Sequence, residues 1–79
     1  MEKRKIIGTL DVLENLKREP DVEQQYTHYL GGILRSTHWL EYKSETQEIG
    51  DSMEWDEYCW MTEQEFLSRF EGHWWSRDC

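Results

Sequence analysis

Hydrophobic positions recur at helical spacing in the first part of the chain. The residues of this face follow one another at steps of three or four: Ile6, Leu10, Leu13 and Leu16. This pattern predicts an amphipathic helix over residues 4–18. Gly8 and Thr9 are poor residues for a helix interior, so a start near Thr9 is the alternative.

Pro20 stops this pattern and also suits the first position of a second helix. Apolar residues again follow at helical spacing: Val22, Tyr26, and Tyr29 or Leu30. Gly31 and Gly32 are typical of a helix end. The first 30 residues are therefore expected to form a helical hairpin over residues 4–30. In the alternative, the helical period continues through the two glycines into one long helix.

Strand-forming residues dominate after the glycines. Alternation over residues 33–42 places His38, Leu40 and Tyr42 on one face. Residues 43–48 are polar and predict a turn, and Ile49-Gly50-Asp51 predicts a second break. An imperfect alternation over residues 53–61 predicts a second strand, paired with the first in a short antiparallel sheet.

The most specific local signal is a capping box. Thr62 fits the N-cap position and Glu65 follows three residues later, with Met61 and Phe66 placed as a hydrophobic staple. It predicts a C-terminal helix over residues 63–71 that ends at Gly72. The expected fold is one small α+β domain over residues 1–79: a helical hairpin, a short sheet and a C-terminal helix. An all-α bundle is the alternative.

Negative charge is concentrated in one window of the chain. Residues 44–68 contain eight acids and no lysine or arginine, so this window accounts for the whole formal charge of -8. Apolar and aromatic residues alternate with these acids: Met53, Trp55, Tyr58, Cys59, Trp60, Met61 and Phe66. Such a segment can bury apolar surface and present carboxylates at the same time, which favours a contact surface.

Motifs for catalysis and for cofactors are absent from the sequence. The closest pair of histidines, His28 and His38, is ten residues apart, and there is no Cys-x-x-Cys spacing. Glycine-rich phosphate loops and nucleophile elbows are also missing. The sequence therefore predicts no catalytic residue, no metal ion and no cofactor, and the protein is not expected to be an enzyme.

Charge and hydropathy restrict the expected partners and location. An acidic chain is repelled by nucleic acid and by anionic membranes, so direct binding to either is not expected. The first five residues, Met-Glu-Lys-Arg-Lys, are followed by only two apolar residues before Gly8, and no segment approaches the length of a membrane span. A soluble, cytoplasmic protein is expected.

The leading functional hypothesis is a small acidic regulator or inhibitor that binds a larger protein. Its carboxylates would imitate nucleic-acid phosphates at a basic site, and its indoles would anchor the contact. Small virus- or phage-encoded inhibitors of nucleic-acid machinery are similar in kind, although no motif is shared. The predicted contact residues are Glu48, Asp51, Glu54, Trp55, Asp56, Glu57, Trp60, Glu63, Trp74 and Trp75.

Two other functional classes stay open. In the first, aromatic surfaces join copies of the chain into a homo-oligomer that serves as a structural or assembly subunit, and the acids keep it in solution. In the second, which the missing motifs disfavour, the chain is a small metal- or cysteine-dependent enzyme that uses Cys59.

Overall fold

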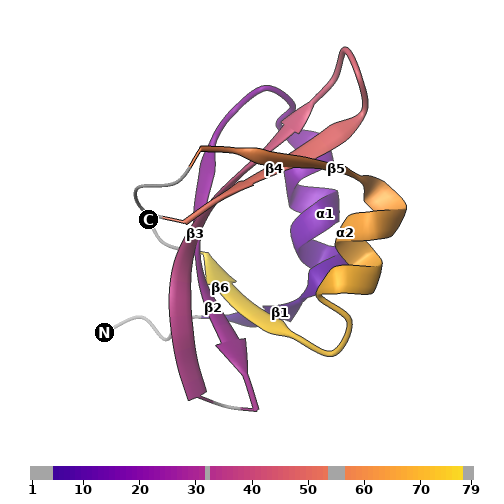
Figure 1. The fold of residues 1–79 in the computed structure, drawn as a ribbon. Helices are drawn as coiled ribbons and strands as arrows, with labels where there is room; N and C mark the ends of the chain where they lie inside the picture. Colours follow the sequence, from indigo (N-terminus) through magenta and orange to yellow (C-terminus); the bar gives the residue numbers. More distant parts are fainter. Residues whose placement is uncertain (1–4, 32, 54–56, 78–79) are drawn as a thin grey trace.

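The chain folds into one curved six-stranded antiparallel sheet with two helices on the same side of it (Figure 1). The computed structural model describes residues 5–31, 33–53 and 57–77. The elements in chain order are β1 (Ile6–Gly8), α1 (Thr9–Arg18), β2 (Gln24–Leu30), β3 (Ile33–Lys43), β4 (Glu48–Ser52), β5 (Cys59–Thr62), α2 (Glu63–Arg69) and β6 (Trp74–Arg77).

The strands lie in the order β1-β6-β2-β3-β4-β5. Strands β2 to β5 form a meander, and α2 then carries the chain back so that β6 inserts between β1 and β2. The face of the sheet that is covered by the helices is called the inner face here, and the opposite one the outer face. Figure 1 shows the sheet bending around both helices.

The hydrophobic core fills the space between the inner face and the helices. Its residues come from both helices and from five of the strands, which is possible because the curved sheet surrounds the helices on more than one side. The core consists of Val12, Leu13, Leu16, Tyr26, Leu40, Tyr42, Ile49, Met61, Phe66, Phe70 and Trp75, with Ile7 and Leu67 packed against it.

The predicted fold class, with its helical hairpin and its all-α alternative, is wrong. Only the first half of the hairpin is helical: α1 begins at Thr9, the alternative start, and ends at Arg18. Asp21 then adopts a positive φ of 63° and turns the chain. Its carboxylate accepts hydrogen bonds from the Ser44 backbone N–H and hydroxyl at 3.1 and 2.6 Å, which lowers the Asp21 pKa and ties this turn to the β3–β4 turn.

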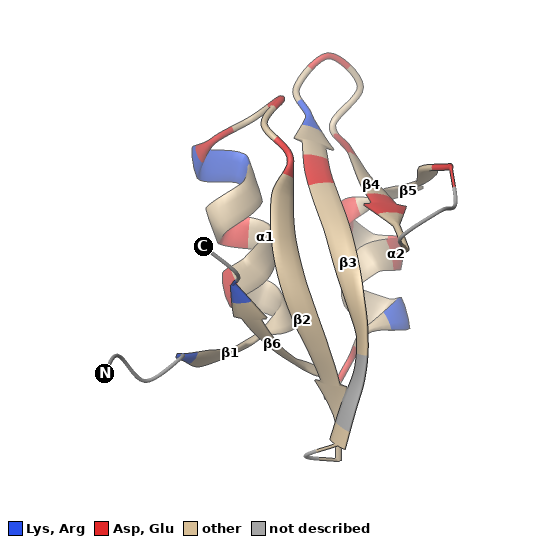
Figure 2. Ribbon diagram, turned by 90° about the vertical axis from the view of Figure 1, so that its left-hand side faces the viewer, with Lys and Arg blue, Asp and Glu red and all other residues tan. Residues whose placement is uncertain are grey.

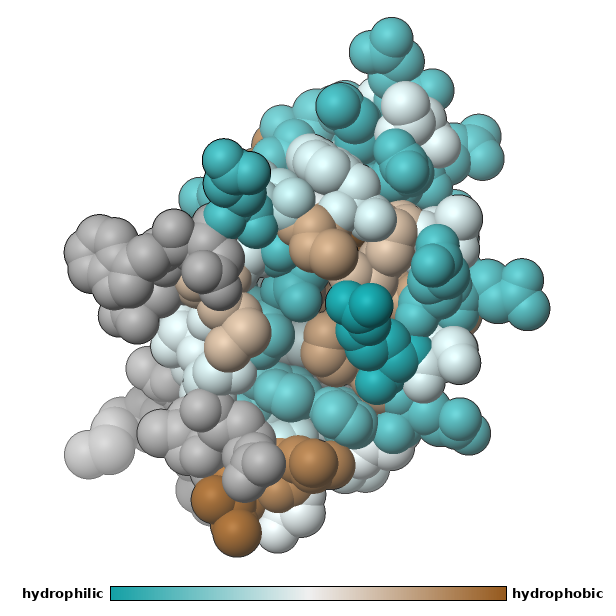
Figure 3. Space-filling view, viewed as in Figure 1, coloured by the Kyte–Doolittle hydropathy of each residue, from teal (hydrophilic) through white to brown (hydrophobic). Residues whose placement is uncertain are grey.

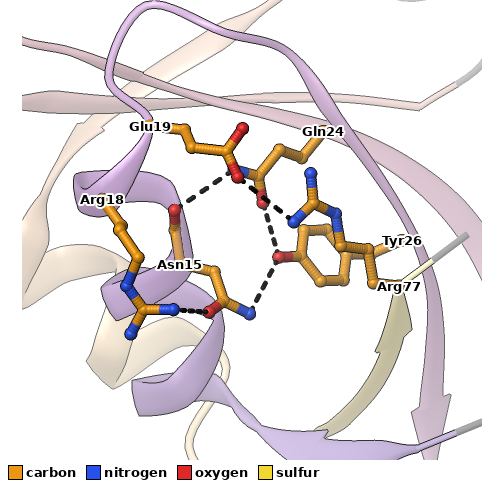
Figure 4. A network of polar contacts seen from close by, with 6 residues as sticks. All are labelled: Asn15, Arg18, Glu19, Gln24, Tyr26 and Arg77. Atoms are coloured by element: carbon orange, nitrogen blue, oxygen red, sulfur yellow. Dashed lines mark hydrogen bonds and ion pairs between the residues drawn. The ribbon is translucent and has the colours of Figure 1, made fainter. Parts of the chain in front are cut away.

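The second predicted helix is strand β2, and its buried polar side chains hide the alternation that is typical of a strand. Gln24, Tyr26 and His28 alternate inward, but only one of the three is apolar enough to be recognised as a core residue. Gln24 Nε2 donates to the Asn15 carbonyl at 3.2 Å, and the Tyr26 hydroxyl donates to Gln24 Oε1 at 2.7 Å (Figure 4). Their hydrogen bonds with α1 therefore offset the cost of burying these polar groups.

The predicted sheet is only partly correct. Strand β3 matches the expected strand over 33–42, and a turn follows it as expected, with Gln47 at φ 58°. However, Ile49-Gly50-Asp51 is not a break but the centre of β4, which lies between β3 and β5. The second predicted strand, over 53–61, therefore does not pair with the first. Its described part becomes a strand only at Cys59.

The C-terminal helix is confirmed together with its cap. The Glu65 N–H donates to Thr62 Oγ1 at 3.1 Å, and the Thr62 N–H donates to Glu65 Oε1 at 3.0 Å. Phe66 is buried beneath the first turn, and Gly72 takes a positive φ of 78° after the helix ends. Because the reciprocal hydrogen bonds are local, the sequence was sufficient to predict them.

Candidate functional site

An aromatic pair lies on the outer face over strand β4. The rings of Tyr58 and Trp60 are 5.4 Å apart between centroids with planes 30° apart, and both lie over Gly50. A Cβ at Gly50 would be 2.8 Å from Tyr58 Cδ1 and 2.9 Å from the Trp60 ring, closer than real Cβ contacts. Glycine at this position therefore allows both rings to pack against the strand.

Three carboxylates lie at the same end of the outer face as this aromatic pair. Glu41 and Glu48 point to the outer face because their neighbours in β3 and β4 are buried on the inner one. The Tyr58 hydroxyl donates a hydrogen bond to the Glu23 carboxylate just before β2. We call these five residues the acidic-aromatic surface: Glu23, Glu41, Glu48, Tyr58 and Trp60.

Acidic residues outnumber basic ones at this end of the outer face. Figure 2 shows red segments around the upper ends of β2, β3 and β4, with one blue segment where β3 ends. That strand ends at Lys43, whose Nζ lies 4.8 Å from the Trp60 ring centroid, a distance at which a cation is attracted to the ring. The indole of Trp60 is still 37% exposed.

Burial and the neighbouring carboxylates raise the pKa of Tyr58. Burial is the main cause that raises its pKa, followed by the hydrogen bond to Glu23 and by the negative charges of Glu23 and Glu41. The neutral phenol is thereby kept as a hydrogen-bond donor within an anionic surface.

We expect Tyr58 to lower the stability of the fold at high pH. In the unfolded chain a tyrosine ionises at about pH 10, whereas folded Tyr58 resists ionisation. The contribution of neutral Tyr58 to the free energy of unfolding is therefore complete below about pH 10 and is lost as the pH rises above it. Absorbance titration of the phenolate, with Tyr58→Phe subtracted from wild type, measures this pKa. Glu23→Gln should lower it, and an unchanged titration would contradict the role of Glu23.

The predicted contact residues are divided between this surface and other parts of the molecule. Glu48 and Trp60 belong to the acidic-aromatic surface. Glu57 is exposed and precedes Tyr58 in the sequence. Three others lie outside the described residues: Glu54, Trp55 and Asp56. The surface thus contains only part of the predicted contact set.

Two predicted acids are engaged within the protein instead. Asp51 is on the inner face, with its carboxylate 2.6 Å from His38 Nδ1. Glu63 begins α2, and its carboxylate pairs with Lys17 Nζ at 3.0 Å. The acidic window therefore does not form one continuous surface, because its residues alternate between the two faces of the sheet.

The two adjacent indoles, Trp74 and Trp75, have opposite environments. Trp75 points inward and is fully buried, so it is not available to a partner. Trp74 points outward from β6 and is 49% exposed, but β2, β3 and β4 lie between it and Trp60. The adjacent pair thus contributes one core residue and one separate exposed residue.

Sequence reasoning missed three members of the surface: Glu23, Glu41 and Tyr58. Alternation between buried Leu40 and Tyr42 could have placed Glu41 on the outer face. Glu23 could not be found in this way, because the sequence pattern predicts a helix there.

The rest of the described chain offers few other sites. Residues 5–31, 33–53 and 57–77 contain no group of three or more His, Cys, Asp or Glu side chains that could hold a metal ion. Neither described helix has the length and apolarity of a membrane span. Apolar side chains are exposed at the β2–β3 hairpin, at the lower end in Figure 3, where Leu30 and Ile33 are 41% and 63% exposed.

Comparison with known proteins gives no assignment. No protein-family model, curated protein or solved structure matches this chain.

Proposed function

We propose that the chain is a protein-binding regulator that presents its acidic-aromatic surface to a basic, nucleic-acid-binding site on a larger protein. The observation that carries this proposal is that three carboxylates lie at the same end of the outer face as one aromatic pair, with Glu23 hydrogen bonded to Tyr58. Such carboxylates can occupy the positions that phosphates take in a basic groove.

Electrostatics support fast and specific association with a basic partner. Glu23, Glu41 and Glu48 come from three neighbouring segments of the sheet, so their negative charges add at one location. These three acids outnumber Lys43, the base beside Trp60, and a surface of net negative charge steers a partner of opposite sign and rejects partners of the same sign.

The aromatic pair supplies the apolar part of the contact. Tryptophan and tyrosine are enriched among the residues that dominate binding energy at protein interfaces. The Tyr58 ring is already held by Glu23, and both rings lie against Gly50. Little side-chain entropy is therefore lost when a partner binds them.

Capture of a partner from a cell lysate at two salt concentrations tests the electrostatic part of the proposal. The immobilised protein is incubated with a cell lysate at low salt and at about 0.5 M salt, where exposed charges are screened over a few ångströms. Captured proteins are identified by mass spectrometry. A basic nucleic-acid-binding protein should be retained at low salt and be released by salt or by competing DNA.

The captured protein is then purified and titrated against matched variants. The triple variant Glu23→Gln, Glu41→Gln and Glu48→Gln should bind about tenfold more weakly or worse, with a flatter salt dependence. Its control removes the same charge from exposed positions elsewhere: Asp11→Asn, Glu14→Gln and Glu71→Gln. Equal affinities of the two triple variants would refute the proposal, as would the capture of no basic protein.

Two tryptophan variants test the aromatic part with the charge unchanged. Trp60→Ala should weaken binding, whereas Trp74→Ala, an exposed indole on the same face but outside the surface, should not. Circular dichroism confirms that each variant is folded before binding is compared. Equal effects of the two substitutions would place the contact elsewhere on the outer face.

A further inference from the structure

A groove opens on the inner face, beyond the end of α2 and away from the acidic-aromatic surface. It has a volume of about 440 Å³ and is lined by His28, Ser36, His38, Asp51, Met53 and Phe70. This volume is within the range of small-molecule sites. Figure 3 shows hydrophobic and hydrophilic surface mixed in the middle of this side of the molecule.

Three of the lining residues form a hydrogen-bonded chain. Ser36 Oγ lies 2.8 Å from His38 Nε2, and His38 Nδ1 lies 2.6 Å from Asp51 Oδ1. Ser36 and His38 are two residues apart in β3 and so share the inner face, while Asp51 projects from the adjacent strand β4. Strand pairing therefore brings the three groups together.

The order of the atoms assigns a role to each group. A carboxylate only accepts hydrogen bonds, so Asp51 requires the proton of a neutral His38 to be on Nδ1. His38 Nε2 then has a free electron pair that faces the Ser36 hydroxyl. His38 is 3% exposed and therefore has a fixed orientation. These distances and this order are those of a serine nucleophile with its base and the group that orients the base.

We propose that Ser36 is a nucleophile that takes up the acyl group of small esters, with His38 as its general base and Asp51 as the residue that positions His38. This site is independent of the proposed protein-binding surface, because it lies on the opposite face of the sheet. Either function can fail without the other.

The reaction is a two-step acyl transfer. Ser36 Oγ attacks the ester carbonyl carbon while His38 Nε2 takes the hydroxyl proton. The bond from that carbon to the ester oxygen breaks, and His38 returns the proton to the departing alcohol. Water then attacks the acyl-serine with the same help from His38, which releases a carboxylic acid and restores the Ser36 hydroxyl.

The walls of the groove indicate a short apolar acyl group. The Phe70 ring meets the His38 ring edge to face at 6.0 Å between centroids, and Met53 is 44% exposed at the groove. On the third side His28 packs against His38 at 5.1 Å and is hydrogen bonded to His73 at 2.6 Å between ring nitrogens. A short apolar acyl group can therefore pack against Phe70 and Met53.

Covalent labelling tests the nucleophile directly. The full chain is treated with a fluorophosphonate that carries a short alkyl group, and the adducts are counted by intact mass and located by peptide mapping. We expect one adduct per chain, at Ser36, and none in Ser36→Ala. Ser68 is exposed on α2 and serves as the internal reference for an unactivated serine. Labelling of Ser36 no faster than of Ser68 would overturn the proposal.

Asp51→Asn tests the positioning role. The amide can present its NH₂ group to His38 and so favour the tautomer that no longer accepts the serine proton, an exchange that lowers turnover about 10⁴-fold in serine proteases. We expect labelling of Ser36 to slow by orders of magnitude while circular dichroism stays unchanged. If a folded Asp51→Asn variant is labelled as fast as wild type, Ser36 is not activated by this chain of groups and the proposal is wrong. The comparison of Ser36 with Ser68 in wild type does not depend on this variant.

Discussion

Replacing Trp75 by alanine should leave about half of the protein or more unfolded at 25 °C. The indole is fully buried and packs against aromatic rings from both helical and strand segments, including Tyr26 at 6.2 Å and Phe70 at 5.1 Å between centroids. Deleting a buried tryptophan side chain costs about 3 to 5 kcal/mol. A domain of this size gains only about 3 to 5 kcal/mol of stability from its core. The loss therefore equals the whole stability.

Trp74 provides the matched control for this experiment. It is the preceding residue in the same strand, but half of its surface is exposed, so Trp74→Ala should cost about 1 kcal/mol or less. Urea unfolding followed by circular dichroism measures both variants. If Trp75→Ala kept a cooperative transition near that of Trp74→Ala, Trp75 could not be a central core residue.

The sequence predicted the elements whose signals are local. The capping box of α2 involves only Thr62 and Glu65, and the amphipathic stripe of α1 includes buried Leu13 and Leu16. Neither depends on distant parts of the chain. Both helices were therefore predicted, but a third helix was predicted where the chain forms strand β2.

Strand β2 was missed because its inward residues are polar. Gln24 and His28 are buried, but nothing in the local sequence shows that Asn15 will satisfy the side chain of Gln24. Val22, Tyr26 and Leu30 happen to have helical spacing. A polar core position can thus be recognised only once its hydrogen-bond partner is known.

Strand β4 was missed for a different reason. Gly50 suggested a break, since glycine is disfavoured within strands. In the structure the missing side chain makes room for Tyr58 and Trp60, and such packing involves residues that local patterns do not connect. The same limit affects the groove, where His38 is joined to Asp51 only through the pairing of β3 with β4.

Composition predicted the chemistry of the candidate surface better than its location. The window of acids and aromatics includes Trp60 and Glu48, but the surface also needs Glu23 and Glu41 from outside it. Because side chains alternate along strands, a charged window is divided between two faces. Asp51 consequently lies in the groove and not beside Trp60.

Replacing Thr9 by valine should cost about 2 kcal/mol although the shape of the side chain is kept. Thr9 is buried, its hydroxyl donates to the Phe70 carbonyl at 2.8 Å, and it accepts a hydrogen bond from Trp75 Nε1 at 2.9 Å. Valine would leave the buried Trp75 Nε1–H without its partner, at about 1 to 3 kcal/mol for an unsatisfied group. The Phe70 carbonyl would still accept a hydrogen bond from the His73 N–H at 3.0 Å.

Thr9→Ser distinguishes the contribution of the hydroxyl to stability from that of the methyl group. Serine keeps both hydrogen bonds and loses one buried methyl, which should cost only about 1 kcal/mol. Urea unfolding of the two variants therefore ranks valine as more destabilising than serine. The opposite ranking would mean that Thr9 acts through packing alone. With the expected ranking, one hydroxyl at the start of α1 links the first helix, the end of the second helix and the last strand.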